Sequence, residues 1–407
     1  MTTPAEPAAP PATPVNRLSP LRFVLVFGLV SSLADFVYEG ARSVIGPYLA
    51  TLGASAAFVG TVTGAGEAVA LVFRLGTGRM SDRLRRHWAQ SIAGYAITIV
   101  SVPLLAVATP LWAASLLFNT ERFGKAVRTP ARDTMLSQAA TDMGRGWTFG
   151  LHEALDQTGA LGGPLVVALV LWLGHGYRAG FAVLAVPGVL ALLALAVLRR
   201  LVPVPAAYEG TARPRSLDVS ARLGPVFWTY AGFSALTMLG FATFAVLAFH
   251  LQARHVVSPA TIPVLYGVAM IGAAFAALGF GRVYDRWGLR GLLTVPLLAA
   301  VVPFLSFTTS TALVWIGAAV WGVALGVHES TMRAAVGDLV APERRGAGYG
   351  TFTAVYGLAW LAGSATIGAL YDVSVTAATV FVVAIQLAAM VAYAVLLRVV
   401  SRDRTDR

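Results

Sequence analysis

Apolar residues gather in runs of roughly twenty along this chain, and short polar segments separate the runs. A helix of ~20 residues, rising 1.5 Å per residue, crosses the ~30 Å hydrocarbon layer of a bilayer. By this criterion we predict twelve membrane-spanning helices. They are expected at 22–46, 58–79, 88–108, 111–128, 147–172, 178–198, 225–250, 261–281, 289–308, 312–333, 348–370 and 375–397. The predicted fold class is therefore an all-α polytopic membrane protein.

The polar segments predict how the spans are grouped. The first residues are rich in Ala, Pro and Thr and lack the charged start and cleavage site of a signal peptide, so we expect a disordered tail. The only long polar connection combines Pro, Gly and charged residues, as linkers do. We therefore predict a cytoplasmic tail 1–20, a six-helix lobe 21–200, a cytoplasmic linker 201–223, a second six-helix lobe 224–398 and a cytoplasmic tail 399–407.

Composition excludes several classes of protein. Only 12% of the residues are charged, about half the fraction of a soluble domain. A chain that is 57% apolar also lacks the low hydrophobicity that disorder requires. The absence of cysteine excludes disulfides, thiolate metal sites and cysteine nucleophiles.

The net charge of +11 reports topology rather than nucleic-acid binding. Among basic residues between the predicted spans, only Arg178 and Arg254 fall on the side opposite the N-terminus. Such a bias follows the positive-inside rule. We therefore expect a multi-pass protein of the inner (plasma) membrane with both termini in the cytoplasm, and no nucleic-acid partner.

The two halves of the chain repeat one pattern. A G-R-x-x-D-R segment containing Asp82 follows the second predicted span, and another containing Asp285 follows the eighth. Asp133 after the fourth span likewise corresponds to Asp338 after the tenth. Because an even number of helices keeps both copies in one orientation, the two lobes are expected to be pseudo-symmetric about an axis along the membrane normal.

On these residues the chain resembles the major facilitator superfamily over its whole length. The family's G-x-x-x-D-R-x-G-R-R loop signature is matched in the first half and echoed in the second, although Arg85 stands where the family usually has Gly. The matching residues are Gly78, Asp82, Arg83, Arg86, Gly281, Asp285 and Arg286. In the fifth span, Gly159, Gly163 and Pro164 are similar to the core of the family's antiporter motif. The resemblance implies twelve helices, alternating access and closest similarity to bacterial drug:proton antiporters.

The loop signature also has a physical interpretation. An aspartate beside arginines at a helix end pairs with them and favours a neighbouring helix N-terminus. We expect these contacts to form a conformational latch that joins the lobes in one state and releases them in the other. The alternative is that they are surface charges that set topology only.

Ionisable residues within the spans are expensive and mark ion or substrate pathways. The expected proton-coupling carboxylates are Asp35, Glu39, Glu67, Glu153 and Asp156. Counting helical rise puts groups from four helices at a similar depth, which predicts one shared polar site with Arg122 as the shared counter-ion. A carboxylate balanced between burial and a nearby arginine can exchange protons near neutral pH. For Glu39 and Arg42, a simple ion pair within the lobe is the alternative.

The second half offers fewer charges and more aromatic rings, so we expect it to supply an aromatic wall. The remaining expected counter-charge and cavity residues are Arg42, Arg74, Arg122, His152, His328, Glu329, Tyr230, Tyr266, Trp321, Tyr356 and Trp360.

The segment His152–Asp156 resembles the H-E-x-x-H zinc pattern with its last ligand replaced by aspartate. A catalytic zinc needs three protein ligands, and the sequence places no third, so we expect no metal, no cofactor and no enzyme activity. The chain also lacks a Gly-rich phosphate-binding loop. Energy for uphill transport is therefore expected to come from an ion gradient.

Together these observations favour a monomeric, proton-coupled secondary transporter that exports small amphipathic or cationic compounds by alternating access. The alternative is a symporter or facilitator that imports a polar or anionic solute held by arginine. A receptor or membrane enzyme without transport activity is a third hypothesis, disfavoured by the duplicated halves. The expected partners are the lipid bilayer, protons and a small-molecule substrate.

Overall fold

The computed structural model describes residues 16–140, 143–208, 223–340 and 345–405. The first lobe contains α1 (Pro20–Thr51), α2 (Ala56–Val72), α3 (Arg74–Leu84), α4 (His87–Leu104), α5 (Leu111–Ala139), α6 (Arg145–Trp172), α7 (Gly176–Val183), α8 (Ala185–Leu201) and the 3-10 turn η1 (Pro205–Tyr208). The second contains α9 (Pro225–Leu239), α10 (Phe244–Ala253), α11 (Thr261–Trp287), η2 (Gly288–Leu293), α12 (Thr294–Ser306), α13 (Thr311–Leu339), α14 (Arg345–Val373) and α15 (Val375–Thr405).

Several of these helices are consecutive pieces of one rod. Because α2 continues into α3, α7 into α8, α9 into α10 and η2 into α12, the described chain forms twelve rods, six in each lobe. Ten of the rods are long and apolar enough to cross a membrane. The other two contain α4 and α5, and α5 carries a series of charged residues along its length. The predicted all-α polytopic fold is confirmed.

Local sequence explains where α1 begins and how it packs. Ser19 is its N-cap, with the hydroxyl accepting from the Arg22 amide, and Pro20 occupies the first turn, where a missing N–H costs nothing. The glycines of the antiporter-like motif bring α6 against α1. A Cβ at Gly159 would collide with the carbonyl of Ser32, and one at Gly163 with the carbonyl of Phe36. Only glycine permits backbones to approach this closely.

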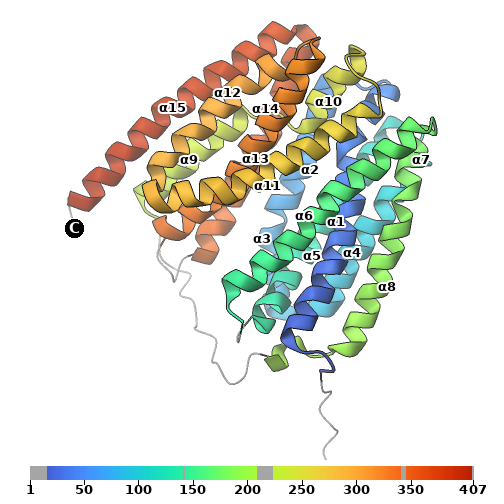
Figure 1. The fold of residues 1–407 in the computed structure, drawn as a ribbon. Helices are drawn as coiled ribbons and strands as arrows, with labels where there is room; N and C mark the ends of the chain where they lie inside the picture. The colour runs from blue at the N-terminus through green and yellow to red at the C-terminus, as the bar shows by residue number, and fades with distance from the viewer. Residues whose placement is uncertain (1–15, 141–142, 209–222, 341–344, 406–407) are drawn as a thin grey trace, which may run out of the picture.

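Figure 1 shows the first lobe in blue to green beside the second lobe in yellow to red. We call the end of the bundle where α1 begins and α15 ends the near end, and the opposite end the far end. The lobes lie side by side along α2 with α14 and α6 with α11, and they diverge toward the near end in Figure 1.

Hydrogen bonds join the lobes in the far half of the molecule. Asp372, near the end of α14, accepts from the amides of Ala56 and Ala57 at the start of α2, at 3.0 and 2.8 Å. The hydroxyl of Tyr177 donates to Gln252 Oε1 at 2.7 Å. Thr63 and Thr243 share a further hydrogen bond of 2.7 Å between their hydroxyls. Among the described residues, the hydrogen bonds between lobes lie at or beyond the level of Glu39.

Several predicted features fall wholly or partly outside the described residues, including residues 406–407 of the predicted tail 399–407 and the side chain of Asp338. The predicted tail 1–20 is described only from residue 16 onward, and 209–222 of the predicted linker lie outside the described ranges. The side chain of Asp285 is also outside the described part of the structure.

Candidate functional site

A polar cavity of about 190 Å³ lies between the two lobes. First-lobe residues from α1, α3, α5 and α6 supply most of its charged lining, and Met270, Ala273, Leu325 and Glu329 line it from the second lobe. The lining carboxylates are Asp35, Glu39, Asp133, Glu153, Asp156 and Glu329, and the lining cations are Arg42, Arg74, Lys125, Arg128 and Arg132. Positive and negative groups are therefore nearly balanced.

One face of α1 supplies four of the polar groups. Asp35, Tyr38, Glu39 and Arg42 follow one another at the three- and four-residue spacing that places side chains on the same side of a helix. All four are buried. The Tyr38 hydroxyl donates to Asp35 Oδ2 at 3.1 Å. The predicted alignment of Asp35, Glu39 and Arg42 on one face therefore matches their positions in the structure.

The cations that pair with these groups come largely from α5. Lys125 Nζ donates to the Tyr38 hydroxyl at 2.7 Å and lies 4.1 Å from the centre of that ring. Arg128 contacts Asp35 Oδ1 at 3.5 Å through Nη2 and donates to Thr98 Oγ1 at 3.1 Å through Nη1.

Sequence reasoning missed these α5 cations. The predicted span 111–128 puts Lys125 and Arg128 at its cytoplasmic end and leaves Arg132 outside the membrane. The helix instead continues to Ala139, and Arg128 is only 1% exposed. The available signal was their spacing of three and four residues, which puts all three on one helix face.

Arg42 connects two carboxylates from different helices. Its Nη2 lies 2.8 Å from Glu67 Oε1, and its Nη1 lies 3.4 Å from Glu39 Oε1. Glu67 lies behind the cavity wall rather than lining the cavity. The alternative of a simple Glu39–Arg42 ion pair is thus incomplete, because Arg42 also forms an ion pair with Glu67 on α2.

Arg122 is not the shared counter-ion that the sequence suggested. It is fully buried, with Nε 2.9 Å from its chain neighbour Glu121 and Nη1 3.8 Å from Glu67. Asp35 pairs with Arg128 instead, and Asp156 pairs with Arg132. Asp35 and Asp156 therefore pair with different cations, both supplied by α5.

On α6, Asp156 has two basic neighbours. Its Oδ2 lies 3.4 Å from Arg132 Nη1 and 3.4 Å from His152 Nδ1. The other oxygen of Asp156 and Nε2 of His152 are buried without a hydrogen-bond partner. Glu153 faces the cavity and accepts from Gln157 Nε2 at 3.0 Å.

The expected aromatic wall is not a wall of this cavity. Tyr266 donates its hydroxyl to Glu39, and the Trp360 ring lies 5.8 Å from the guanidinium carbon of Arg42. The remaining expected residues pack inside the second lobe rather than lining the cavity. Tyr230 donates to the Met332 carbonyl, Trp321 stacks on Phe241 and donates to the Ala242 carbonyl, His328 lies against Met332 Sδ, and Tyr356 packs against Trp360. These aromatic side chains therefore pack mainly against other residues of the second lobe.

The predicted latch residues lie at the near end. Asp82, Arg83, Arg86 and Arg286 are exposed, and the ion pairs in the described part of the chain include none of them. A side chain added at Gly78 or Gly281 would meet open space. The latch remains a prediction for a state in which the near end is closed.

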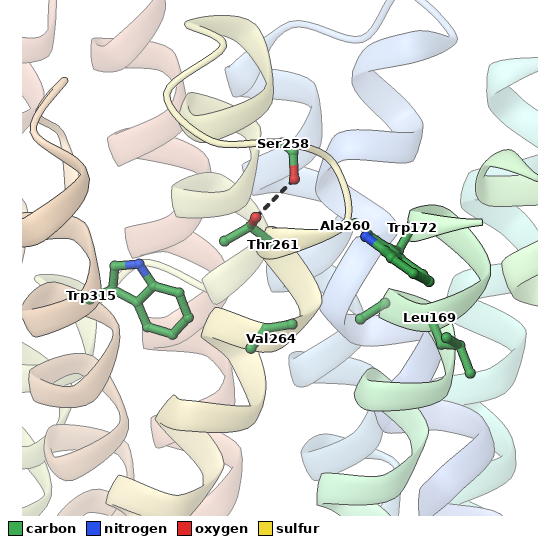
Figure 2. Close-up of a pocket in the computed structure, with 8 residues that line it drawn as sticks. Leu169, Trp172, Ser258, Ala260, Thr261, Val264 and Trp315 are labelled. Carbon is green, nitrogen blue, oxygen red and sulfur yellow. Dashed lines mark hydrogen bonds between the residues drawn. The ribbon is translucent and has the colours of Figure 1, made fainter. Parts of the chain in front are cut away.

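Two other features bear on the choice of site. Among the described residues, no group of three His, Asp or Glu is arranged to hold a metal ion. Figure 2 shows a larger pocket, about 320 Å³, between the far ends of α6, α11 and α13. Its hydroxyl groups, on Ser258 and Thr261, bond to each other at 2.8 Å, and no charged residue lines it. Its exposed Trp172 is typical of a membrane interface.

Comparison with known proteins gives a consistent picture. The family model for the Major Facilitator Superfamily matches residues 27–363 and 238–407. An uncharacterized protein of Mycobacterium tuberculosis is 49% identical over 92% of this chain and 92% of its own length. An uncharacterized MFS-type transporter of Methanocaldococcus jannaschii is 26% identical, covering 86% of this chain and 89% of that protein.

Solved structures show the same fold at low identity. A mutant of the nucleoside transporter NupG superposes with a TM-score of 0.77 at 15% identity, over 92% of this chain and 99% of that chain. A bacterial homologue of the human lysosomal transporter Spinster, in an inward-facing and occupied conformation, gives 0.69 at 16% identity, over 93% and 97%. These two likenesses show the fold alone.

Proposed function

Because this chain belongs to the major facilitator superfamily, we propose that it is a proton-coupled secondary transporter of small polar solutes. The polar cavity between the lobes is the binding site, and it opens alternately to the two sides of the membrane as the lobes rock. In the state described here the far end is held together by hydrogen bonds between the lobes. The positive-inside bias supports assigning the near end to the cytoplasm.

The observation that carries this proposal is the set of ion pairs at the cavity. Asp35 with Arg128 and Glu39 with Arg42 each combine a buried carboxylate with a buried cation, and Asp156 is a buried carboxylate beside the half-buried Arg132. Buried charges are retained only when paired, because water is not available to solvate them. A protonated carboxylate is neutral and no longer requires a cation beside it. Proton uptake is therefore linked to separation of the ion pair.

Glu39 connects this chemistry to the position of the lobes. The ionised carboxylate accepts from Tyr266 on the second lobe and pairs with Arg42 on its own helix. A protonated Glu39 is a poorer acceptor and no longer attracts Arg42. We therefore expect protonation to weaken a contact between the lobes and to favour opening of the far end. Glu67, which does not line the cavity, acts as the fixed partner of Arg42.

The volume of the cavity supports a small solute. About 190 Å³ accommodates about six waters at ~30 Å³ each, below the ~300–1,000 Å³ of sites for drug-sized ligands. The sequence-based proposal of a cationic substrate depended on an excess of carboxylates. The cavity-lining cations Lys125, Arg128 and Arg132 remove most of that excess.

Export of small amphipathic or cationic compounds is the second candidate. It is favoured by Glu153, a cavity carboxylate that accepts from Gln157 but has no cation within ion-pair distance among the described residues. Vectorial flux separates the candidates, because an exporter lowers accumulation of its substrate in whole cells whereas an importer raises it.

The absence of native cysteine makes the proposal testable without knowledge of the solute. Leu84→Cys and Trp287→Cys place spin labels on exposed positions at the near end, one on each lobe. In wild-type background we expect the distance between the labels to be long at pH 9 and a shorter population to appear at pH 5. Double electron–electron resonance in lipid nanodiscs measures both populations.

The variants define the coupling residues. Glu39→Gln and Asp156→Asn are each expected to reduce the pH response, and together to abolish it. Glu153→Gln is the matched control, because this carboxylate lines the same cavity but pairs with no described cation. A distance distribution that is identical at pH 5 and pH 9 in the wild type would overturn proton coupling.

A further inference from the structure

Two charged groups that line the cavity from different lobes form no ion pair within 4 Å with another described residue. Lys125 in the first lobe donates to the Tyr38 hydroxyl, but no carboxylate lies within ion-pair distance of it among the described residues. Glu329 in the second lobe faces the cavity, and in the described part of the chain no cation is within ion-pair distance of it. The other lining arginines with a described ion pair are held by Glu39, Asp35 or Asp156.

The internal repeat relates these two positions. α5 and α13 are the fourth rods of their lobes, and the aspartates Asp133 and Asp338 mark corresponding points on them. By that alignment Glu329 is one residue away from the counterpart of Lys125. The duplicated unit therefore presents a positive charge to the cavity from one copy and a negative charge from the other.

We propose that the transported solute is a small zwitterion, with its anionic group on Lys125 and Tyr38 and its cationic group on Glu329. This inference rests on the proposed transport function and specifies its substrate class. Lys125 carries three donors, of which one is used by Tyr38 in the structure. The Glu329 carboxylate accepts hydrogen bonds only, so an ammonium group is its natural complement.

The charge balance of the site selects a zwitterion over simpler ions. An anion alone pairs with Lys125 but leaves Glu329 without an ion-pair partner, and a cation alone leaves Lys125 without one. Lys125 is half-buried and Glu329 is exposed at the cavity, so a solute can reach both charges, and hydrogen bonds to charged groups are about twice as strong as those between neutral groups. A zwitterion satisfies both residues and leaves the net charge of the cavity unchanged.

A solute that binds through both of its charged groups also affects the relative position of the lobes. Lys125 belongs to the first lobe and Glu329 to the second, so only a solute with both charges forms charged hydrogen bonds with both of these residues. A ligand shifts a conformational equilibrium by its difference in affinity between the states. The zwitterion is therefore the ligand that favours closure of the near end, whereas ions of one charge bind one lobe and favour closure less.

The test uses the purified full-length protein and a graded set of probes. The zwitterions are glycine, β-alanine, 4-aminobutyrate and 6-aminohexanoate, which differ in the separation of their charges. Each is matched by a carboxylate and an amine of similar length, such as hexanoate and hexylamine for the longest. Binding is measured by isothermal titration calorimetry at pH 7. We expect at least one zwitterion to bind, and its two single-charge analogues to bind about tenfold to a hundredfold more weakly, because each forgoes one charged hydrogen-bonding partner.

The variants test the two residues directly. Lys125→Gln and Glu329→Gln are each expected to weaken binding of that zwitterion at least tenfold, and the double charge exchange Lys125→Glu with Glu329→Lys to restore most of it. Arg200→Gln, an exposed change outside the cavity and outside the predicted latch, is the control and leaves affinity unchanged. Monodispersity in gel filtration shows that each variant is folded.

Three results would overturn the inference. They are equal affinity for zwitterions and their single-charge analogues, unchanged zwitterion affinity in Glu329→Gln, and no binding of any zwitterion in the set. The spin-label experiment identifies which proposal has failed. A pH response that persists while zwitterions fail to bind rejects the substrate class alone, and loss of the pH response rejects the coupled transport function.

Discussion

Arg42 is the residue on which most contacts of the polar site converge. It pairs with Glu67 on α2 and Glu39 on α1, and its guanidinium lies against the Trp360 ring of the second lobe. Without Arg42, two buried carboxylates would lose their main cation. Removing one partner of a buried ion pair is usually far more costly than removing both.

We therefore expect Arg42→Met to lower the free energy of unfolding by about 3–5 kcal/mol. The double variant Arg42→Met with Glu67→Gln is expected to regain part of that loss, because the uncompensated charge on α2 is removed while Glu39 on α1 stays without its cation. Unfolding by SDS titration in mixed micelles measures both. Arg83→Met, on the exposed surface, serves as the control, and an equal loss in the single and double variants would contradict the prediction.

At the residue scale, the sequence predicted some of the site well. Asp35, Glu39 and Arg42 were predicted to share a face because helical spacing alone decides that arrangement. Lys125, Arg128 and Arg132 were missed because a polar helix segment buried between other helices looks, in one sequence, like a segment outside the membrane. Which cation serves which carboxylate depends on the packing of α5 against α1 and α6, and the sequence does not encode that packing locally.

The positions of the helices were easier to predict than the contacts between them. All twelve rods overlap the predicted spans, because runs of apolar residues long enough to cross a bilayer have few alternatives. The ends differ most where polar residues extend the helix, as in α5, which reaches Ala139 rather than residue 128. The four-residue spacing of Gly159 and Gly163 is typical of close helix packing, but it does not indicate that α1 is the partner.

That packing supports a prediction about α6. Gly159→Ala places a methyl group where the Ser32 carbonyl of α1 lies, and overpacking of this kind costs about 1–3 kcal/mol. Gly150→Ala on the same helix meets open space and is expected to be neutral or slightly stabilising, because alanine is the better helix former. Thermal unfolding in detergent compares the two, and equal midpoints for both variants would refute the close approach.

At the scale of the whole molecule, the repeat predicted two similar lobes, but it did not predict which end is closed. The far-end-closed and far-end-open states contain the same helices, so the hydrophobic pattern of the sequence does not distinguish them. The closure seen here depends on particular contacts at the far end, such as that of Asp372 with the first amides of α2. Nothing in the local sequence indicated that this carboxylate would cap a helix of the other lobe.

Asp372→Ala is expected to open the far end more often. Loss of an N-terminal cap costs about 0.5–2 kcal/mol. Because Asp372 contacts α2 across the lobes, the substitution destabilises only the state in which the far end is closed. The population ratio is therefore expected to shift about twofold to thirtyfold toward a far-end-open state. Spin labels at Val107→Cys and Thr311→Cys, exposed and on different lobes, report the change as a new, longer distance.

Asp372→Asn is the matched variant, since the amide oxygen still accepts one hydrogen bond while the charge is lost. An intermediate shift is expected for it. If Asp372→Ala leaves the far-end distances unchanged, the contact does not contribute to closure.

The near balance of positive and negative side chains around the cavity has an electrical consequence. A site whose own charges nearly cancel carries little net charge as the lobes rock, so the current per cycle equals the charge on the cargo. With a neutral solute and one proton, each turnover moves one elementary charge through the membrane field, worth ~2.3 kcal/mol per 100 mV. That amounts to a concentration ratio of ~50 per 100 mV, which means that voltage alone, with no difference in pH, is enough to drive accumulation.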